Sequence, residues 1–270
     1  MFRNRLTLRR REMLAGLAFA ALPVLGFAFF YFVPFGITIY KTFTANGGRF
    51  VGLTNYMNVV TSQAFLLAAG NTLKFIGVGV PALLALALAV ALAINRKLKG
   101  SSFYRAAFAL PIVLPTASVV MVFQIIFPSQ NVGGGSFITL LALYIWKNMG
   151  YAIILMAGGL AQIPRDLSEA ARVDGAGAFT TLRKITLPML LPTIAFTAMF
   201  AIMFAFKAFR EAFALAGNYP NDSIYMLQHF MNNNFANLNY PRLSVAAVLT
   251  FIVIAALVWA LFRREFREVD

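Results

Sequence analysis

Long apolar windows separated by short polar segments dominate this chain. Crossing about 30 Å of hydrocarbon takes roughly 20 helical residues, and six windows are long enough. They are Met13–Tyr40, Leu66–Ile94, Ala106–Phe127, Phe137–Gln162, Met189–Ala216 and Leu243–Phe262. Gly and Pro interrupt several of them, which membrane helices tolerate better than soluble helices do. The pattern predicts an all-α integral membrane protein with six transmembrane helices.

The composition agrees with a membrane protein. Of the 270 residues, 60% are hydrophobic and only 12% are charged, which is too little charge to cover the surface of a soluble domain of this size. The first apolar window is too long for the apolar region of a cleaved signal peptide, so we interpret it as a retained helix. Cysteine is absent and His229 is the single histidine. These counts argue against disulfides and metal sites, and we expect no catalytic or metal-ligating residue.

The basic residues predict the orientation in the membrane. One side of the predicted membrane carries 16 Lys and Arg residues and the other side carries three. The 16 lie in residues 1–12, 95–105, 163–188 and 263–270, and the three are Lys41, Arg49 and Arg242. Because Lys and Arg concentrate in cytoplasmic loops, we expect both termini in the cytoplasm. This distribution explains the net charge of +14 without a nucleic-acid partner.

The windows and their polar connections divide the chain into four parts. We expect a basic cytoplasmic N-terminus (1–12), a first helix with its outer segment (13–64), a core (65–263) that contains the loop 163–192, and a cytoplasmic tail (264–270). Residues 217–241 form an outer segment rich in asparagine and aromatic residues. This segment is either a docking surface for a soluble partner or a solvated loop with interfacial aromatics.

The cytoplasmic loop reads EAARVDGAGAFTTLRKITLP over residues 169–188. Pro164 and Asp166 suit the start of a helix, Gly175 can bend the chain, and a helical pattern resumes at Phe179. The sequence therefore predicts a short helix, a bend and a second helix outside the membrane. Such an element suits insertion into a groove on a cytoplasmic partner, and an amphipathic connector is the alternative.

The spacing of this loop resembles the EAA loop of the membrane subunits of ATP-binding-cassette (ABC) importers. The matching positions are Glu169, Ala170, Ala171, Asp174, Gly175, Ile185, Leu187 and Pro188. The segments 71–75, 103–115 and 145–164 are similar to the carbohydrate-type permeases of this superfamily, in particular to the first permease of sugar importer pairs. The resemblance covers roughly residues 71–262. It departs in a shorter turn after the third window and in the outer segment LAGNYPNDS (215–223), where many relatives have a GGP-type sequence.

The resemblance implies a type I ABC importer permease fold in a bacterial cytoplasmic membrane. The implied partners are a second permease subunit in a heterodimer, two cytoplasmic ATP-binding cassette subunits, an extracytoplasmic solute-binding protein and membrane lipid. The EAA positions would couple the spans to the ATPases, with Glu169 meeting an arginine there. This chain has no G-x-x-x-x-G-K-[ST] motif and so lacks a phosphate-binding loop of its own. ATP and Mg²⁺ are therefore expected on the partner subunits, and this chain is not expected to be an enzyme.

Four ionisable residues within the apolar windows are candidates for the substrate path. Charges in a membrane are costly and often functional. Lys147 lies about ten residues into its window, so at 1.5 Å per residue it is roughly 15 Å deep. Lys207, Arg210 and Glu211 share one helical face by their i, i+3 and i+4 spacing. They form either a polar wall of the path or a structural ion pair within one helix.

Two other functions remain open at this point. The same architecture can import an acidic or phosphorylated solute, which the cations would suit. A non-ABC channel or secondary transporter is also conceivable, although no paired inverted repeat is visible. A membrane-embedded enzyme needs convergent acid–base or metal groups, and the composition offers few.

Overall fold

The computed structural model describes residues 2–95, 107–108, 110–127 and 137–266 as helices joined by short connections. The long helices are α1 (Phe2–Phe27), α4 (Gln63–Asn95), α7 (Phe137–Gln162), α10 (Leu187–Lys207) and α13 (Tyr240–Phe266). The shorter ones are α2 (Val33–Thr42), α3 (Thr54–Val60), α6 (Thr116–Ile126), α8 (Arg165–Val173), α9 (Ala178–Thr181), α11 (Phe209–Ala216) and α12 (Leu227–Ala236). Two π turns, η1 (Ala28–Phe32) and η2 (Leu182–Thr186), and a 3₁₀ turn, η3 (Asp222–Ile224), complete the described part.

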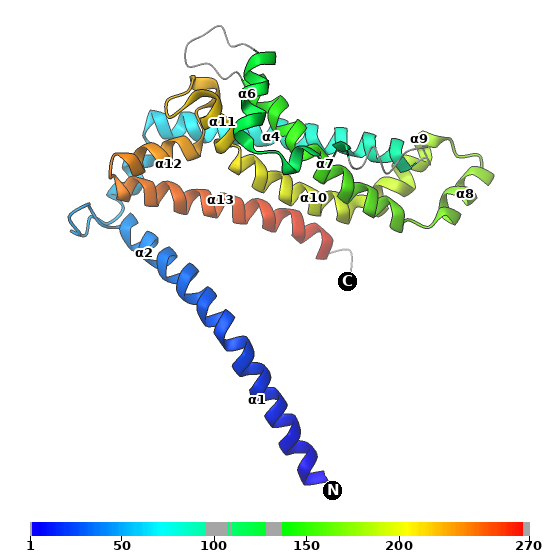
Figure 1. Cartoon of the computed structure of the whole chain (residues 1–270), viewed down its shortest axis with the longest axis horizontal. Helices are drawn as coiled ribbons and strands as arrows, with labels where there is room; N and C mark the ends of the chain where they lie inside the picture. Colours follow the sequence, from blue (N-terminus) through cyan, green and yellow to red (C-terminus); the bar gives the residue numbers. More distant parts are fainter. Residues whose placement is uncertain (1, 96–106, 109, 128–136, 267–270) are drawn as a thin grey trace.

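The body of the protein is a bundle of α4, α7, α10 and α13 (Figure 1). The fully buried side chains at its centre include Phe75, Leu83 and Ile153. Tyr144 is 2% exposed, and its hydroxyl donates a 2.7 Å hydrogen bond to the carbonyl oxygen of Ala201. This bond satisfies a polar group that hydrocarbon would otherwise strand, and it ties α7 to α10.

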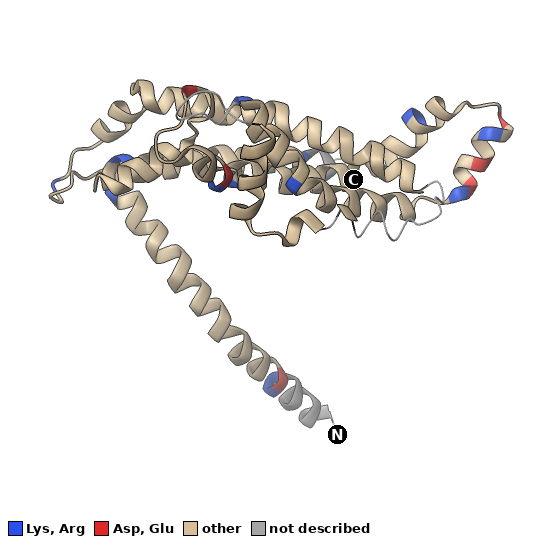
Figure 2. Ribbon diagram, turned by 45° about the horizontal axis from the view of Figure 1, so that its top comes forward, with Lys and Arg blue, Asp and Glu red and all other residues tan. Residues whose placement is uncertain are grey.

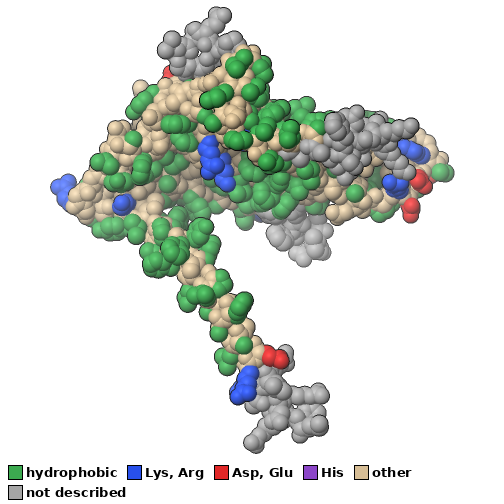
Figure 3. Space-filling model, in the orientation of Figure 1, with side chains coloured by type: hydrophobic (Ala, Val, Ile, Leu, Met, Phe, Trp, Pro, Cys, Tyr) green, Lys and Arg blue, Asp and Glu red, His purple; other side chains and the backbone are tan. Residues whose placement is uncertain are grey.

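Many apolar side chains and few charged ones lie on the face of the bundle seen in Figure 3. Leu73, Leu86 and Ile154 are each about half exposed although they lie in the middle of long helices. A soluble protein buries such side chains, whereas lipid solvates them. The ribbon shows few charges along the bundle and more at the tip near α8 and near the N-terminus (Figure 2).

The N-terminal helix projects away from the bundle (Figure 1). Arg10–Thr42 is a continuous helical stretch of 33 residues, and the most apolar part of it has no buried residue. Its contact with the body lies at α2, where the Phe35 and Phe251 ring centroids are 4.9 Å apart. This stretch confirms the predicted first membrane helix.

Within the described part of the chain, five helices are long and apolar enough to cross a membrane. They confirm the predicted windows that begin at Met13, Leu66, Phe137, Met189 and Leu243. The third window, Ala106–Phe127, is not confirmed as a single span. Its helix α6 has 11 residues, or about 16 Å at 1.5 Å per residue, which is too short for about 30 Å of hydrocarbon.

A proline separates α6 from the helical residues before it. Pro115 has an extended ψ of 133° at the N-cap of α6, and proline also disfavours a helical conformation at the residue that precedes it. Residues 106 and 109 of the third window lie outside the described residues. The sequence pattern missed this break because both sides of it are apolar.

Close packing of α7 against α10 depends on a missing side chain at Gly159. An alanine Cβ there would lie 2.7 Å from Leu190 Cδ1 and 2.8 Å from Thr193 Cγ2. The adjacent Gly158 has nothing within 4 Å of the same position.

We expect Gly159→Ala to destabilise the protein by about 1–3 kcal/mol, because overpacking forces the facing side chains out of place. Gly158→Ala should be neutral or slightly stabilising, since alanine favours a helix. Thermal unfolding of the purified variants in detergent measures both effects. Equal melting temperatures for the two variants would contradict this packing argument.

Candidate functional site

The EAA loop (163–192) forms a helix, a bend and a second helix, as predicted. Helix α8 begins after Pro164, with Asp166 in its first turn and Arg172 in its last turn. Both charges complement the helix dipole. A second helical stretch begins at Ala178 and continues through α9 and η2 into α10. The EAA loop is therefore continuous with a membrane helix.

A Schellman cap fixes the spacing between Ala171 and Gly175. The amide of Ala176 donates to the carbonyl of Ala171 at 2.8 Å, and the amide of Gly175 donates to that of Arg172 at 3.1 Å. This pair of bonds requires a left-handed residue after the helix, and Gly175 has φ +79°. Glycine adopts that conformation without steric cost. The backbone conformation of the cap therefore explains the spacing between Ala171 and Gly175 in the motif.

The tip of the EAA loop is exposed. Glu169, Ala170, Asp174, Gly175 and Pro188 are exposed, and Ala171, Ile185 and Leu187 are partly exposed. Three large apolar side chains lie on the same tip without cover, namely Leu167, Val173 and Phe179, which are 42%, 88% and 73% exposed. The tip lies at the far end of the molecule from α12 (Figure 1).

The four charged candidates line one cavity of about 290 Å³. We call this cavity the charged pocket. Its lining consists of Ile112, Tyr144, Lys147, Asn148, Tyr151, Phe204, Lys207, Ala208, Arg210 and Glu211. Helix α10 ends at Lys207 and α11 begins at Phe209, so a break at Ala208 lies between the charged residues that sequence spacing put on one continuous helix.

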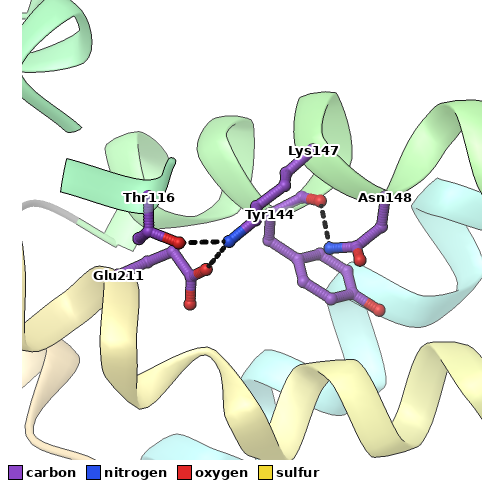
Figure 4. Close-up of polar contacts among 5 residues, drawn as sticks. All are labelled: Thr116, Tyr144, Lys147, Asn148 and Glu211. Carbon is purple, nitrogen blue, oxygen red and sulfur yellow. Dashed lines mark hydrogen bonds and ion pairs between the residues drawn. The ribbon is translucent and has the colours of Figure 1, made fainter. Parts of the chain in front are cut away.

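An ion pair joins two helices in the charged pocket (Figure 4). Lys147 of α7 donates to the carboxylate of Glu211 on α11, and also donates to Thr116 Oγ1 of α6 at 2.7 Å. The two charged side chains are only 21% and 10% exposed. Among the described residues, Glu211 forms its ion pair with Lys147 rather than with Lys207 or Arg210. The predicted ion pair within one helix is therefore wrong, because spacing along one helix cannot detect a partner 64 residues away.

The pocket also contains polar and aromatic residues that the sequence analysis did not select. Asn148 donates to the carbonyl of Tyr144 at 2.8 Å. The Tyr151 hydroxyl is buried without a hydrogen-bond partner in the described structure. Phe204 stacks edge-on against Tyr151. Trp146 of α7 is not part of the lining and packs on Phe123 at 5.8 Å between ring centroids.

The segment after α11 covers the end of the bundle that bears α12. We call residues 217–239 the outer cap. Asn71 of α4 donates to the carbonyl oxygens of Asp222 and Tyr225, and Thr72 Oγ1 accepts the amide of Leu227 at 3.0 Å. Residues 71–75 were noted for a family resemblance, and the structure shows that the first two anchor the cap.

Several asparagines of the outer cap hold it together. The Asn232 side chain donates to Asn218 Oδ1 at 2.9 Å, and Asn233 donates to the Asn218 carbonyl at 3.2 Å. Asn233 is buried. The exposed surface of the cap instead carries Tyr219 and Phe235, which are 72% and 58% exposed.

The described residues contain no group of three or more metal-ligating side chains of the His, Cys, Asp and Glu types. The charged pocket therefore has the chemistry of a polar binding surface, with cations, a carboxylate, amide and hydroxyl groups beside aromatic rings. The EAA loop and the outer cap lie at opposite ends of the same bundle (Figure 1).

Comparisons with known proteins agree on the family. Residues 82–264 match the model of the binding-protein-dependent transport system inner membrane component. The chain is 31% identical to the multiple sugar-binding transport system permease protein MsmF of Streptococcus mutans, over 88% of this chain and 91% of that protein. It is 27% identical to the trehalose/maltose transport system permease protein MalF of Thermococcus litoralis, over 88% of this chain and 85% of that protein.

The fold is also known from a solved structure. A chain of a bacterial ABC transporter involved in the import of the acidic polysaccharide alginate superposes with a TM-score of 0.78, over 97% of this chain and 99% of that chain. The identity is 19%, so this likeness shows the permease fold alone. Together with the family match over residues 82–264, it shows that the chain is a multi-pass membrane transport subunit and belongs to the family of binding-protein-dependent transport system inner membrane components.

Proposed function

We propose that this chain is the permease subunit of an ATP-driven ABC importer that moves a carbohydrate, meaning a sugar, an oligosaccharide or a polyol. The observation that carries the proposal is the exposed EAA loop, capped at Gly175 and continuous with α10. Relatives named for multiple sugars and for trehalose and maltose support the carbohydrate class. These relatives favour a carbohydrate over an acidic or phosphorylated solute. The family match argues against a channel or a secondary transporter.

The EAA loop is proposed to dock on cytoplasmic ATPase subunits that bind ATP and Mg²⁺. The exposed Leu167, Val173 and Phe179 would fill an apolar groove on the ATPase, and Glu169 would face a cation at its edge. Ala170 and Ala171 permit close approach because their side chains are small. Ile185, Leu187 and Pro188 lie where the loop enters α10, so a displacement of the tip would be transmitted into the membrane.

We expect Gly175→Val to reduce transport at least about tenfold, because a β-branched residue at φ +79° costs about 1–3 kcal/mol and distorts the cap. The protein should still reach the membrane in normal amount. Uptake of a radiolabelled sugar together with co-purification of the ATPase measures both effects.

Gly177→Val is the matched control for this experiment. Gly177 has φ −69° and ψ 164°, which valine adopts readily, and nothing lies within 4 Å of its Cβ position. Normal transport and normal ATPase association in Gly175→Val would refute the docking assignment.

The charged pocket is proposed to line the substrate path, with Lys147, Lys207, Arg210 and Glu211 as its polar wall. The support is that all four side chains line one cavity with Tyr144, Tyr151 and Phe204. Aromatic rings offer apolar faces to sugar rings, while the charged and amide groups offer hydrogen bonds to hydroxyls. The cavity of about 290 Å³ suits a small ligand.

Arg210→Ala should reduce uptake about tenfold, the loss expected from one hydrogen bond to a charged group. The amount of assembled complex should stay unchanged, because Glu211 keeps its ion pair with Lys147. Arg49→Ala is the control, since Arg49 is exposed outside the pocket. Wild-type uptake by Arg210→Ala would exclude this residue from the path.

The proposed setting is a bacterial cytoplasmic membrane with both termini in the cytoplasm. The basic asymmetry of 16 to three residues supports this orientation, and it puts the EAA loop on the side of the ATPases. The remaining proposed partners are a second permease subunit in a heterodimer and an extracytoplasmic binding protein that docks on the outer cap.

Single-cysteine labelling tests the orientation cleanly, because the chain has no cysteine of its own. Asn237→Cys should react with a membrane-impermeant maleimide in intact cells, since Asn237 is exposed on the outer cap. Ser101→Cys, in the basic connection 95–105, should react only after permeabilisation. The opposite labelling pattern would reverse the proposed topology.

A further inference from the structure

Helix α11 is a short rigid segment between two bends. At one end Ala208 interrupts the helix, with ψ −6° and an amide that donates to Ala205. At the other end Gly217 has φ +73°. A helix of eight residues flanked by such bends can turn as a unit, because backbone rotation at a few terminal residues is enough for a hinge.

The side of α11 that faces the bundle is held by the ion pair. Lys147 Nζ joins α7, α11 and α6 through Glu211 and Thr116. The Gln124 side chain of α6 adds a 3.2 Å hydrogen bond to the carbonyl of Leu215 on α11. Because separating a buried ion pair leaves two poorly solvated charges, the pair opposes rotation of α11.

The opposite side of α11 is held by the outer cap through two rings. The His229 ring meets the Phe209 ring edge-on at 4.8 Å between centroids, and Tyr225 stacks on His229 at 5.7 Å. His229 is fully buried, and burial lowers its pKa to about 4, so its ring is neutral at physiological pH. Its Nδ1 accepts the amide of Met226 at 3.1 Å, which fixes the ring within the cap.

Phe209 is thus next to the pocket residues Arg210 and Glu211 in sequence and against the outer cap in space. The cap itself is tied to α4 by Asn71 and Thr72, and the bond between Asn232 and Asn218 holds its two ends together. A tilt of the cap about its α4 anchors therefore acts on α11 through the Phe209–His229 contact.

We propose that Phe209 and His229 link the outer cap to the Lys147–Glu211 ion pair, so that a binding protein seated on the cap turns α11 and separates the pair. This inference rests on the proposed function and adds its regulation. Tyr219, Phe235 and Leu238 form the exposed apolar surface of the cap, at 72%, 58% and 63% exposure. A binding protein that prefers the turned state shifts the equilibrium by its differential affinity. Phe209 and His229 are positioning residues in this scheme.

The test is ATP hydrolysis by the reconstituted full complex, with and without its own sugar-loaded binding protein. Phe209→Ala should reduce the stimulation by the binding protein about fivefold or more, a typical size for coupling between sites. Its unstimulated hydrolysis should stay low, because the ion pair is intact. His229→Leu should reproduce this effect and serves as the second variant if Phe209→Ala assembles poorly.

Phe213→Ala is the matched control. Phe213 lies one turn further along α11 and touches Phe209 at 5.5 Å between centroids, but its recorded ring contact is with Phe209 and not with His229. Stimulation in Phe213→Ala should remain near that of the wild type. Equal loss in Phe209→Ala and Phe213→Ala would overturn a specific link.

The order of the two contacts gives a sharper test. Glu211→Gln removes the ion pair but keeps a hydrogen-bond acceptor, so its hydrolysis should be high without the binding protein. The double variant Phe209→Ala/Glu211→Gln should behave like Glu211→Gln, because the ring contact affects ATP hydrolysis only through the ion pair, which Glu211→Gln has already removed. The charge exchange Lys147→Glu/Glu211→Lys should restore low unstimulated hydrolysis.

Besides equal loss in Phe209→Ala and Phe213→Ala, two further results would overturn the inference. One is full stimulation in both Phe209→Ala and His229→Leu, and the other is low unstimulated hydrolysis in Glu211→Gln or in the double variant. Failure of the proposed function looks different, because the wild-type complex would then import no sugar and show no stimulation at all.

Discussion

The inability of hydrocarbon to solvate charges and unpaired backbone groups is the constraint on which this structure depends. It explains why the spans are long helices whose backbone groups bond within the same segment. It also explains why Lys147 and Glu211, which come from different helices, are paired with each other. The break at Ala208 lies beside this pair and lines the same cavity, where interrupted backbone is tolerated because lipid does not reach it.

Much of the architecture could be predicted from sequence because membrane insertion leaves a strong one-dimensional signal. Five apolar windows correspond to long helices, and the EAA loop folds as its proline and glycine positions indicate. The Schellman cap at Gly175 is a local feature of a few consecutive residues, so local sequence is sufficient to specify it. The break at Pro115 within the third window could not be predicted, because the residues on both sides of it are apolar.

The candidate site was only partly predictable. The search for charged residues within the apolar windows found four residues that line one cavity, because such charges are rare in membrane helices. The alternative of an ion pair within one helix does not hold for Glu211, because its ion pair joins α7 to α11 and depends on how the helices pack. Asn148 and Tyr151 gave no signal, since a polar residue in an apolar helix points to a cavity only once the fold is known. The roles of Asn71, Thr72 and His229 in the cap likewise depend on tertiary contacts, which the sequence pattern does not reveal.

The continuous helical stretch from Ala178 to the break at Ala208 has a mechanical consequence. Its segments α9, η2 and α10 have 4, 5 and 21 residues, which together correspond to about 45 Å at 1.5 Å per residue, roughly one and a half times the thickness of the hydrocarbon layer. Such a rod works as a lever. A change in inclination of about 6° moves one end by about 5 Å relative to the other at that length. Small rotations at the end that bears the EAA loop are thereby converted into displacements as large as a sugar ring beside the charged pocket, without any bond within the rod being broken.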